Sequence, residues 1–98
     1  MSFKIFKFEI PIMEEIIDID LPQGAKILKV DAQNNTPVFW ASFNVEEDDD
    51  IFLAMDTRYF KVCGTGELVV EMKDYQYEYL GTFQLTGGSF VGHFYEVI

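Results

Sequence analysis

The sequence contains little of what most catalytic and metal sites are built from. Its 98 residues include one cysteine, Cys63, and one histidine, His93. A lone cysteine forms no intrachain disulfide, and one Cys with one His cannot supply the three or four ligands of a zinc site. A thiol nucleophile needs a base in contact with it, and the strand-like surroundings of Cys63 contain no turn that would expose it. We therefore expect no enzyme activity, no catalytic residues, no metal and no cofactor.

Cations are also scarce, since seven Lys and Arg stand against seventeen Asp and Glu, a formal net charge of −10. Nonspecific binding to DNA or RNA requires clustered cations that displace counterions from the phosphates. We therefore expect no direct binding to nucleic acid or to an anionic membrane. The charge either serves solubility or makes the protein an acidic decoy for a basic, nucleic-acid-binding protein.

The apolar N-terminal stretch 1–17 is interrupted by charges and matches neither a signal peptide nor a membrane span. The sequence therefore predicts a cytoplasmic protein. Its length fits a single domain, 1–98, because most domains contain about 100–150 residues.

Aromatic residues are abundant, at 16% of the chain, with ten Phe, five Tyr and one Trp. A core of this size cannot easily enclose all of these rings. Aromatic side chains are enriched at interfaces, so we expect some of them on a surface that meets a partner or another copy of the chain.

The dominant hydrophobic period is two, which is typical of strands. Asn34 and Asn35 tolerate the left-handed conformation of a tight turn and predict a hairpin. The pattern predicts a mostly β fold, a small antiparallel β-sandwich or barrel of about seven strands, whose edges a homo-oligomer would protect. Two segments stay open: 68–72 is a strand or irregular, and 47–57 is a short helical turn or a loop. The predicted strands cover residues 3–10, 17–21, 25–33, 38–43, 58–63, 77–85 and 90–95.

One stretch combines cations, an aromatic ring and a glycine loop, which are the elements of a site for a small anionic ligand. Backbone N–H groups of such a loop bind anions, and a neighbouring ring stacks on a base. A solvated strand face explains the same residues equally well. The candidate ligand-binding residues are Arg58, Phe60, Lys61, Gly64, Thr65, Gly66 and His93.

Five consecutive acids form a second candidate surface. They lack the spaced oxygen ligands and the glycine of an EF-hand loop, so they do not predict a calcium site. They form either a solvated loop or the acidic surface that would contact a basic host protein. These residues are Glu46, Glu47, Asp48, Asp49 and Asp50.

Several short motifs follow one another along the chain. These segments are Phe6-Lys7-Phe8-Glu9-Ile10-Pro11, Leu21 to Leu28, Trp40-Ala41, Gly64-Thr65-Gly66, Tyr79-Leu80-Gly81-Thr82-Phe83 and Gly87 to His93. In this order they resemble a family of short phage and prophage proteins of unknown function. One departure is Gly92, where the family pattern has a tryptophan. The resemblance spans nearly the whole chain and implies a setting in an infected bacterial host, but no mechanism.

This setting gives three functional hypotheses for a protein without an enzyme signature. The first is a phage accessory protein that counters host defence by sequestering a small nucleotide-type signal, for which it needs a local positive surface within an acidic protein. The second is an acidic inhibitor that mimics nucleic acid and occupies a basic groove of a host defence protein. The third is a structural or assembly factor of the virion.

Overall fold

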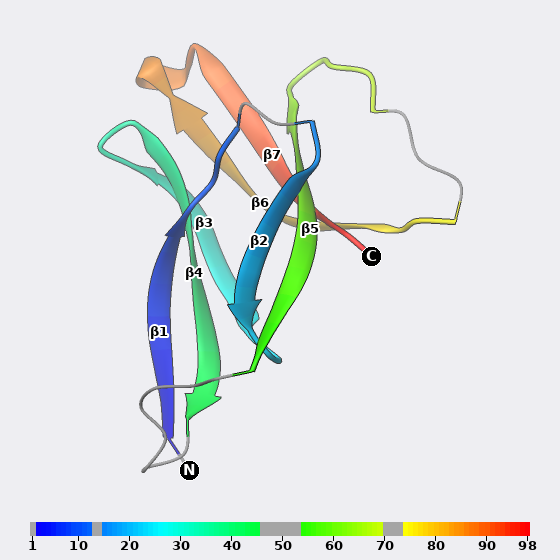
Figure 1. The fold of residues 1–98 in the computed structure, drawn as a ribbon. Helices are drawn as coiled ribbons and strands as arrows, with labels where there is room; N and C mark the ends of the chain where they lie inside the picture. Colours follow the sequence, from blue (N-terminus) through cyan, green and yellow to red (C-terminus); the bar gives the residue numbers. More distant parts are fainter. Residues whose placement is uncertain (1, 13–14, 46–53, 70–73) are drawn as a thin grey trace.

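A computed structural model describes residues 2–12, 15–45, 54–69 and 74–98, and its strands form two antiparallel sheets (Figure 1). Sheet A has the strand order β1-β4-β3, and sheet B has the order β2-β5-β7-β6. The seven strands confirm the predicted all-β fold, and the two separate sheets make it a β-sandwich rather than a closed barrel. The strands are β1 (Ser2–Glu9), β2 (Ile17–Pro22), β3 (Lys26–Gln33), β4 (Thr36–Val45), β5 (Met55–Gly64), β6 (Tyr77–Leu85) and β7 (Phe90–Val97).

Two hairpins follow directly from turn residues. Asn34 and Asn35 both have positive φ, at 52° and 60°, which gives the two-residue turn that matches the twist of the β3 and β4 strands. The short 3₁₀ turn Thr86–Gly88 joins β6 to β7. The Asn34-Asn35 hairpin and the predicted strands 77–85 and 90–95 are confirmed, and several strand ends lie one or two residues beyond the predicted limits.

Stacked phenylalanines fill the space between the sheets. Phe39 of sheet A lies 5.9 Å from Phe60 and 5.5 Å from Phe94 of sheet B, measured between ring centroids. Phe60 and Phe94 stack on each other at 5.0 Å. All three rings are fully buried, and burying each contributes about 1.5–3 kcal/mol. This stack fixes which face of each strand points inward.

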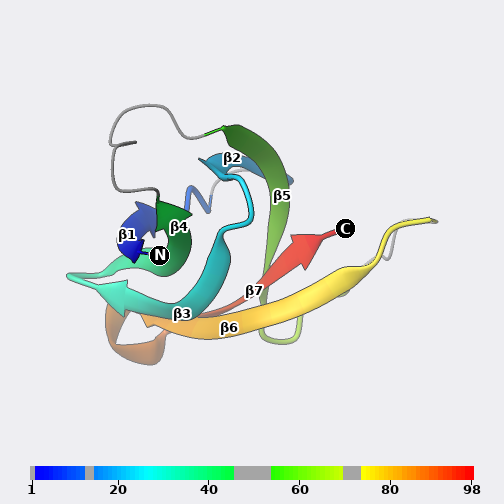
Figure 2. The ribbon, with the colours of Figure 1, turned by 90° about the horizontal axis from the view of Figure 1, so that it is seen from below.

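The two sheets come closest where β3 crosses β6 (Figure 2). A Cβ added to Gly81 would lie 2.6 Å from Cβ of Val30, so only glycine allows this approach. Both strands are irregular near this point, with register shifts between Ile27 and Lys29 and between Tyr79 and Gly81. The irregularities bend each strand where the two sheets meet.

For residues 47–57 the sequence left a short helical turn and a loop open, and neither describes the last three, because Met55, Asp56 and Thr57 begin β5 and pair with Pro22, Leu21 and Asp20 of β2. The pairing partner overrides the helix preference of Met55. Residues 47–53 lie outside the described residues, as do 70–72 of the segment 68–72, whereas Leu68 and Val69 are irregular. Among the described residues there is no helix of the length and apolarity that crossing a membrane requires.

Candidate functional site

The structure places Arg58 on the inner face of sheet B, where it is held by the protein itself. Its guanidinium donates to both carboxylate oxygens of Glu96, at 2.7 and 2.6 Å, and to the carbonyl oxygen of Ala25 at 2.5 Å. The guanidinium carbon lies 6.0 Å from the centroid of Phe60. The hydrogen bonds that Arg58 donates to Glu96 raise the pKa of Arg58. Arg58 is therefore partly buried, with 24% of its side chain exposed, and Phe60 is fully buried, so the stretch 58–61 does not form one surface.

Lys61 points to the opposite, outer face of sheet B, because neighbouring residues of a strand alternate. The glycine loop lies at the end of β5, with φ of +86° at Gly66, a conformation that favours glycine. A Cβ at Gly64 would meet the carboxylate of Glu67. Of the predicted site residues, the structure brings together Thr65 and His93 on the outer side and Arg58 and Phe60 on the inner side.

His93 is the centre of a chain of hydroxyl groups. The hydroxyl of Thr65 lies 2.7 Å from Nε2 and that of Thr82 lies 2.9 Å from Nδ1, and the Tyr79 hydroxyl continues the chain to Thr82. Cys63 is directly opposite His93 in the pairing of β5 with β7. Both ring nitrogens are engaged by threonines, and burial raises the pKa of the Cys63 thiol. The pair therefore lacks the acidic thiol and free base of a cysteine nucleophile.

All five tyrosines of the chain gather on the outer side of sheet B, a surface we call the tyrosine face. Directly opposite residues share a face, so the cross-strand pairs place four of them together. Tyr79 and Tyr95 meet edge to face at 5.5 Å. A surface pocket of about 280 Å³ is lined by Ile16, Tyr59, Tyr75 and Val97. The residues of the tyrosine face are Tyr59, Lys61, Cys63, Tyr75, Tyr77, Tyr79, Thr82, His93, Tyr95 and Val97.

The outer side of sheet A has a different chemistry. The register places Lys7 of β1 opposite Trp40 of β4, and Trp40 opposite Lys29 of β3, so the indole lies between two lysines in one row. The neighbouring row contains Ile5, Ser42 and Lys26. We call these two rows the lysine face. The three lysines are exposed and Trp40 is partly exposed, so both the indole and the lysine side chains are accessible from solvent.

Acidic groups lie along one end of the lysine face. The next row contains Glu9 and Asp31, which both lie opposite Val38. Asp31 forms an exposed ion pair with Lys29 at 3.4 Å and accepts the backbone N–H of Ala32 at 2.8 Å. These contacts, the backbone hydrogen bond first, lower the pKa of Asp31. Lys7 donates to Oε1 of Gln33 at 2.6 Å, so each of the two lysines that flank Trp40 in the register has one polar partner on β3.

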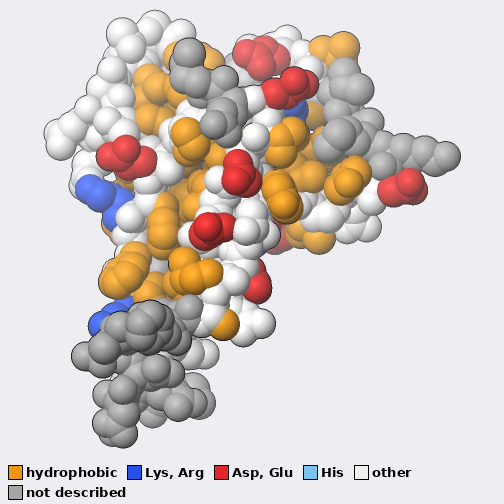
Figure 3. Space-filling model, in the orientation of Figure 1, with side chains coloured by type: hydrophobic (Ala, Val, Ile, Leu, Met, Phe, Trp, Pro, Cys, Tyr) orange, Lys and Arg blue, Asp and Glu red, His pale blue; other side chains and the backbone are white. Residues whose placement is uncertain are grey.

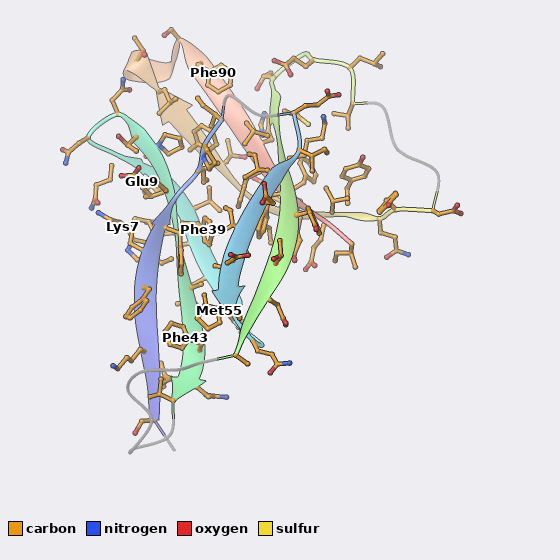
Figure 4. All side chains as sticks on the ribbon, in the orientation of Figure 1. Lys7, Glu9, Phe39, Phe43, Met55 and Phe90 are labelled. Atoms are coloured by element: carbon orange, nitrogen blue, oxygen red, sulfur yellow. The ribbon has the colours of Figure 1, made fainter. Side chains whose placement is uncertain are left out.

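The space-filling view agrees with this division of charge (Figure 3). On the side shown, cationic side chains lie mainly along the margin of the molecule over β1, and acidic side chains spread over the middle. The side-chain view shows Lys7 at that margin, whereas Phe39 lies between the sheets (Figure 4). Of the cationic residues that the structure describes, Lys4, Lys7, Lys26 and Lys29 belong to sheet A, and Arg58 and Lys61 belong to sheet B.

Sequence reasoning missed the lysine face because its members are far apart in the chain. One signal was available: the predicted hairpin about Asn34-Asn35 already pairs Lys29 with Trp40. Lys7 joins them only through the long-range pairing of β1 with β4. The acidic run 46–50 lies outside the described residues, and among the described residues no three His, Cys, Asp or Glu side chains form a metal-binding group.

These features define a small two-sheet β-sandwich with two chemically distinct outer faces. The chain belongs to a family described as a domain of unknown function, DUF7352, whose model matches residues 1–98. Comparisons with curated proteins and with solved structures found no significant match.

Proposed function

We propose that this chain is a non-enzymatic binding protein that sequesters a small nucleotide-type anion on the lysine face. The observation that carries the proposal is the cross-strand row Lys7–Trp40–Lys29. It supplies the local positive surface that such a function requires in a protein of net charge −10.

The row combines the two interactions that recognise a nucleotide. A base that stacks on an exposed aromatic side chain gains about 1–3 kcal/mol. Adjacent strands are about 4.8 Å apart, so the flexible stems of Lys7 and Lys29 can direct their ammonium groups to a phosphate attached to that base. Lys26 in the neighbouring row can reach a second phosphate. The exposed positions of all three lysines leave their remaining N–H donors available to a ligand.

The biological setting is a further part of this proposal. The motif resemblance supports a phage or prophage protein that acts in the cytoplasm of an infected bacterium. Sequestering a nucleotide-type signal there would counter host defence without any catalytic step, because a binder lowers the free concentration of the signal. The binding protein itself would make and break no covalent bond.

Trp40 is the only tryptophan of the chain, so its fluorescence tests the proposal directly. We would titrate mono-, di- and cyclic nucleotides and related signals, and measure quenching together with thermal stabilisation. We expect at least one nucleotide to quench Trp40, with an affinity that falls as salt rises. The double variant Lys7→Gln/Lys29→Gln should weaken it at least tenfold.

Lys61→Gln is the control for position, because it removes one positive charge from the tyrosine face, where the double variant removes two from the lysine face. It should leave the titration unchanged. Loss of binding in Lys61→Gln with full binding in the double variant would show that the ligand binds on the tyrosine face instead. If no nucleotide of the panel changes either signal, the proposal is wrong.

The second candidate is the acidic inhibitor of a basic host protein, and the tyrosine face favours it. Tyrosine supplies large contact area at low entropic cost and is enriched at protein interfaces. Asp18 of β2 lies directly opposite Tyr59, and Asp20 follows on the same face; both are exposed. For a purified basic host nuclease or other nucleic-acid-binding defence protein, Tyr59→Ala and Asp18→Asn should each weaken inhibition, whereas Lys29→Gln should not.

A further inference from the structure

Strand β1 is exposed to an unusual degree for part of a sheet. Seven of its eight residues are exposed, and they include three large apolar side chains. Phe3 is 64% exposed, and Ile5 and Phe6 are each 50% exposed. One edge of β1 pairs with β4, and none of the described residues pairs with the other edge. Its unpaired backbone groups and apolar side chains therefore lie together.

The other three edge strands are modified in ways that hinder pairing with another chain. β3 has a register shift between Ile27 and Lys29, and β6 has one between Tyr79 and Gly81. β2 has six residues and ends at Pro22, which has no N–H to donate. In contrast, β1 keeps an unbroken register with β4 over all eight residues. A long, regular, apolar edge is the usual template for pairing with another chain.

We propose that β1 is the interface of a homodimer in which two copies pair edge to edge, antiparallel, across a twofold axis at Ile5. This inference does not depend on the proposed ligand. The dimer would join the two copies of sheet A into one six-stranded sheet, with the order β1-β4-β3 in each copy running outward from the axis.

The charges on β1 select this register. A twofold axis at Lys4 or Lys7 would place two lysines directly opposite each other, which is unfavourable. An axis at Ile5 places Phe3 opposite the partner subunit's Lys7 and Phe6 opposite the partner subunit's Lys4. Each ammonium then meets an aromatic ring, a favourable cation–π arrangement, and Ile5 packs on the partner's Ile5.

An axis at Phe6 also avoids pairing lysines, but it would set Phe3 opposite the partner's Glu9. That arrangement gains no cation–π contact for Phe3. The axis at Ile5 is therefore the better register. It also brings the three most exposed apolar side chains of β1 into contact with the second copy.

Mass measurement in solution tests the interface. Sedimentation or light scattering should give twice the 11.4 kDa mass of one chain at micromolar concentration. Ile5→Lys creates the unfavourable lysine pair at the axis and should give a monomer. Ile5 is half exposed on the outer face, so this variant should keep the circular dichroism and melting temperature of a folded chain. Leu68→Lys is the control, because Leu68 is 88% exposed outside the strands, and it should remain dimeric.

Disulfide formation tests the register. In a Cys63→Ala background, Ile5→Cys should crosslink two chains under mild oxidation, because the two residues at the axis have Cβ atoms about 4.5–5.5 Å apart. Phe6→Cys should not, because its copy lies on the diagonal, about 7–8 Å away. Crosslinking by Phe6→Cys alone would overturn the register.

Two further outcomes would overturn the interface. One is a wild-type chain that stays monomeric up to the highest soluble concentration. The other is a dimer that survives Ile5→Lys but is lost with Tyr59→Ala, which would place the contact on the tyrosine face. The dimer and nucleotide binding should also respond to salt in opposite directions. Salt screens repulsion between two chains of charge −10 and should strengthen the dimer, whereas it should weaken nucleotide binding.

Discussion

The two outer faces of this sandwich differ in chemistry although both are built from alternating strands. The lysine face of sheet A places one indole between two lysines in one row, with a third lysine in the neighbouring row. The tyrosine face of sheet B contains five phenols, the only histidine and one lysine. The first suits a small anion, and the second suits a protein surface. Strand register alone produces this separation, because the lysines and tyrosines are scattered along the chain.

The separation depends on which cations are already paired with other groups of the protein. Arg58 looks in the sequence like the best ligand-binding cation, yet it is held inside by Glu96. Lys7 and Lys29 have only exposed polar contacts, with Gln33 and Asp31. Whether a cation is available to a ligand therefore depends on its exposure and its competing partners rather than on residue type.

The largest expected effect tests the interior position of Arg58. Glu96→Ala leaves the guanidinium half-buried and without its carboxylate, and should lower the free energy of unfolding by about 3 kcal/mol, at the low end for a buried pair because some exposure remains. Urea denaturation followed by circular dichroism measures the loss. Asp31→Asn, which breaks the exposed ion pair on sheet A, is the control and should have little effect. Equal losses in the two variants would mean that Arg58 is not held more firmly than Lys29.

A smaller effect tests which side of β7 faces inward. The ring of Phe83 covers Gly92, and an added Cβ would lie 2.8 Å from Cε2 of that ring. Gly92→Ala should therefore destabilise the fold by about 1–3 kcal/mol through overpacking. Asn44→Ala, at an exposed position on the outer face of β4, is the control and should be near neutral in the same denaturation assay. If Gly92→Ala proved neutral, the Phe83 ring would have to move freely.

Local signals were sufficient to predict most of the fold. Period-two alternation located the strands, and Asn34-Asn35 located one hairpin, because turn chemistry and alternation act over a few residues. For Met55 to Thr57 the same reasoning left a helical turn or a loop open and did not predict a strand, because pairing with β2 decides the conformation. The glycine expected to be a tryptophan, Gly92, has a physical reason that only the fold reveals: Phe83 occupies the space of its side chain.

The candidate site was less accessible to prediction. Arg58, Phe60 and Lys61 are adjacent in sequence, but alternation sends Lys61 to one face and the other two to the opposite face, a division that period two already implies. The row of Lys7, Trp40 and Lys29 depends on the order β1-β4-β3, which no local pattern specifies. The sequence therefore did not predict the long-range strand pairing on which this row depends.

Breaking the hydrogen-bond chain around His93 should affect the tyrosine face and leave the lysine face intact. His93→Ala removes the acceptor and donor between Thr65 and Thr82, and should lower the free energy of unfolding by about 1 kcal/mol. Nucleotide quenching of Trp40 should remain unchanged, because the imidazole lies on sheet B. Reduced quenching in a folded His93→Ala protein would show that the two faces are coupled.

The smallest effect concerns the reactivity of the one thiol. Burial raises the pKa of Cys63, so at a given pH a smaller fraction is thiolate than in an unfolded chain. Because the thiolate is the reactive form, modification by a disulfide reagent at pH 8 should be slower in the native protein than in urea, by more than tenfold when burial also blocks access. The rate should rise with pH through the raised pKa. A native Cys63 that reacts as fast as the unfolded one would contradict the burial of the thiol and would reopen its pairing with His93 as a reactive site.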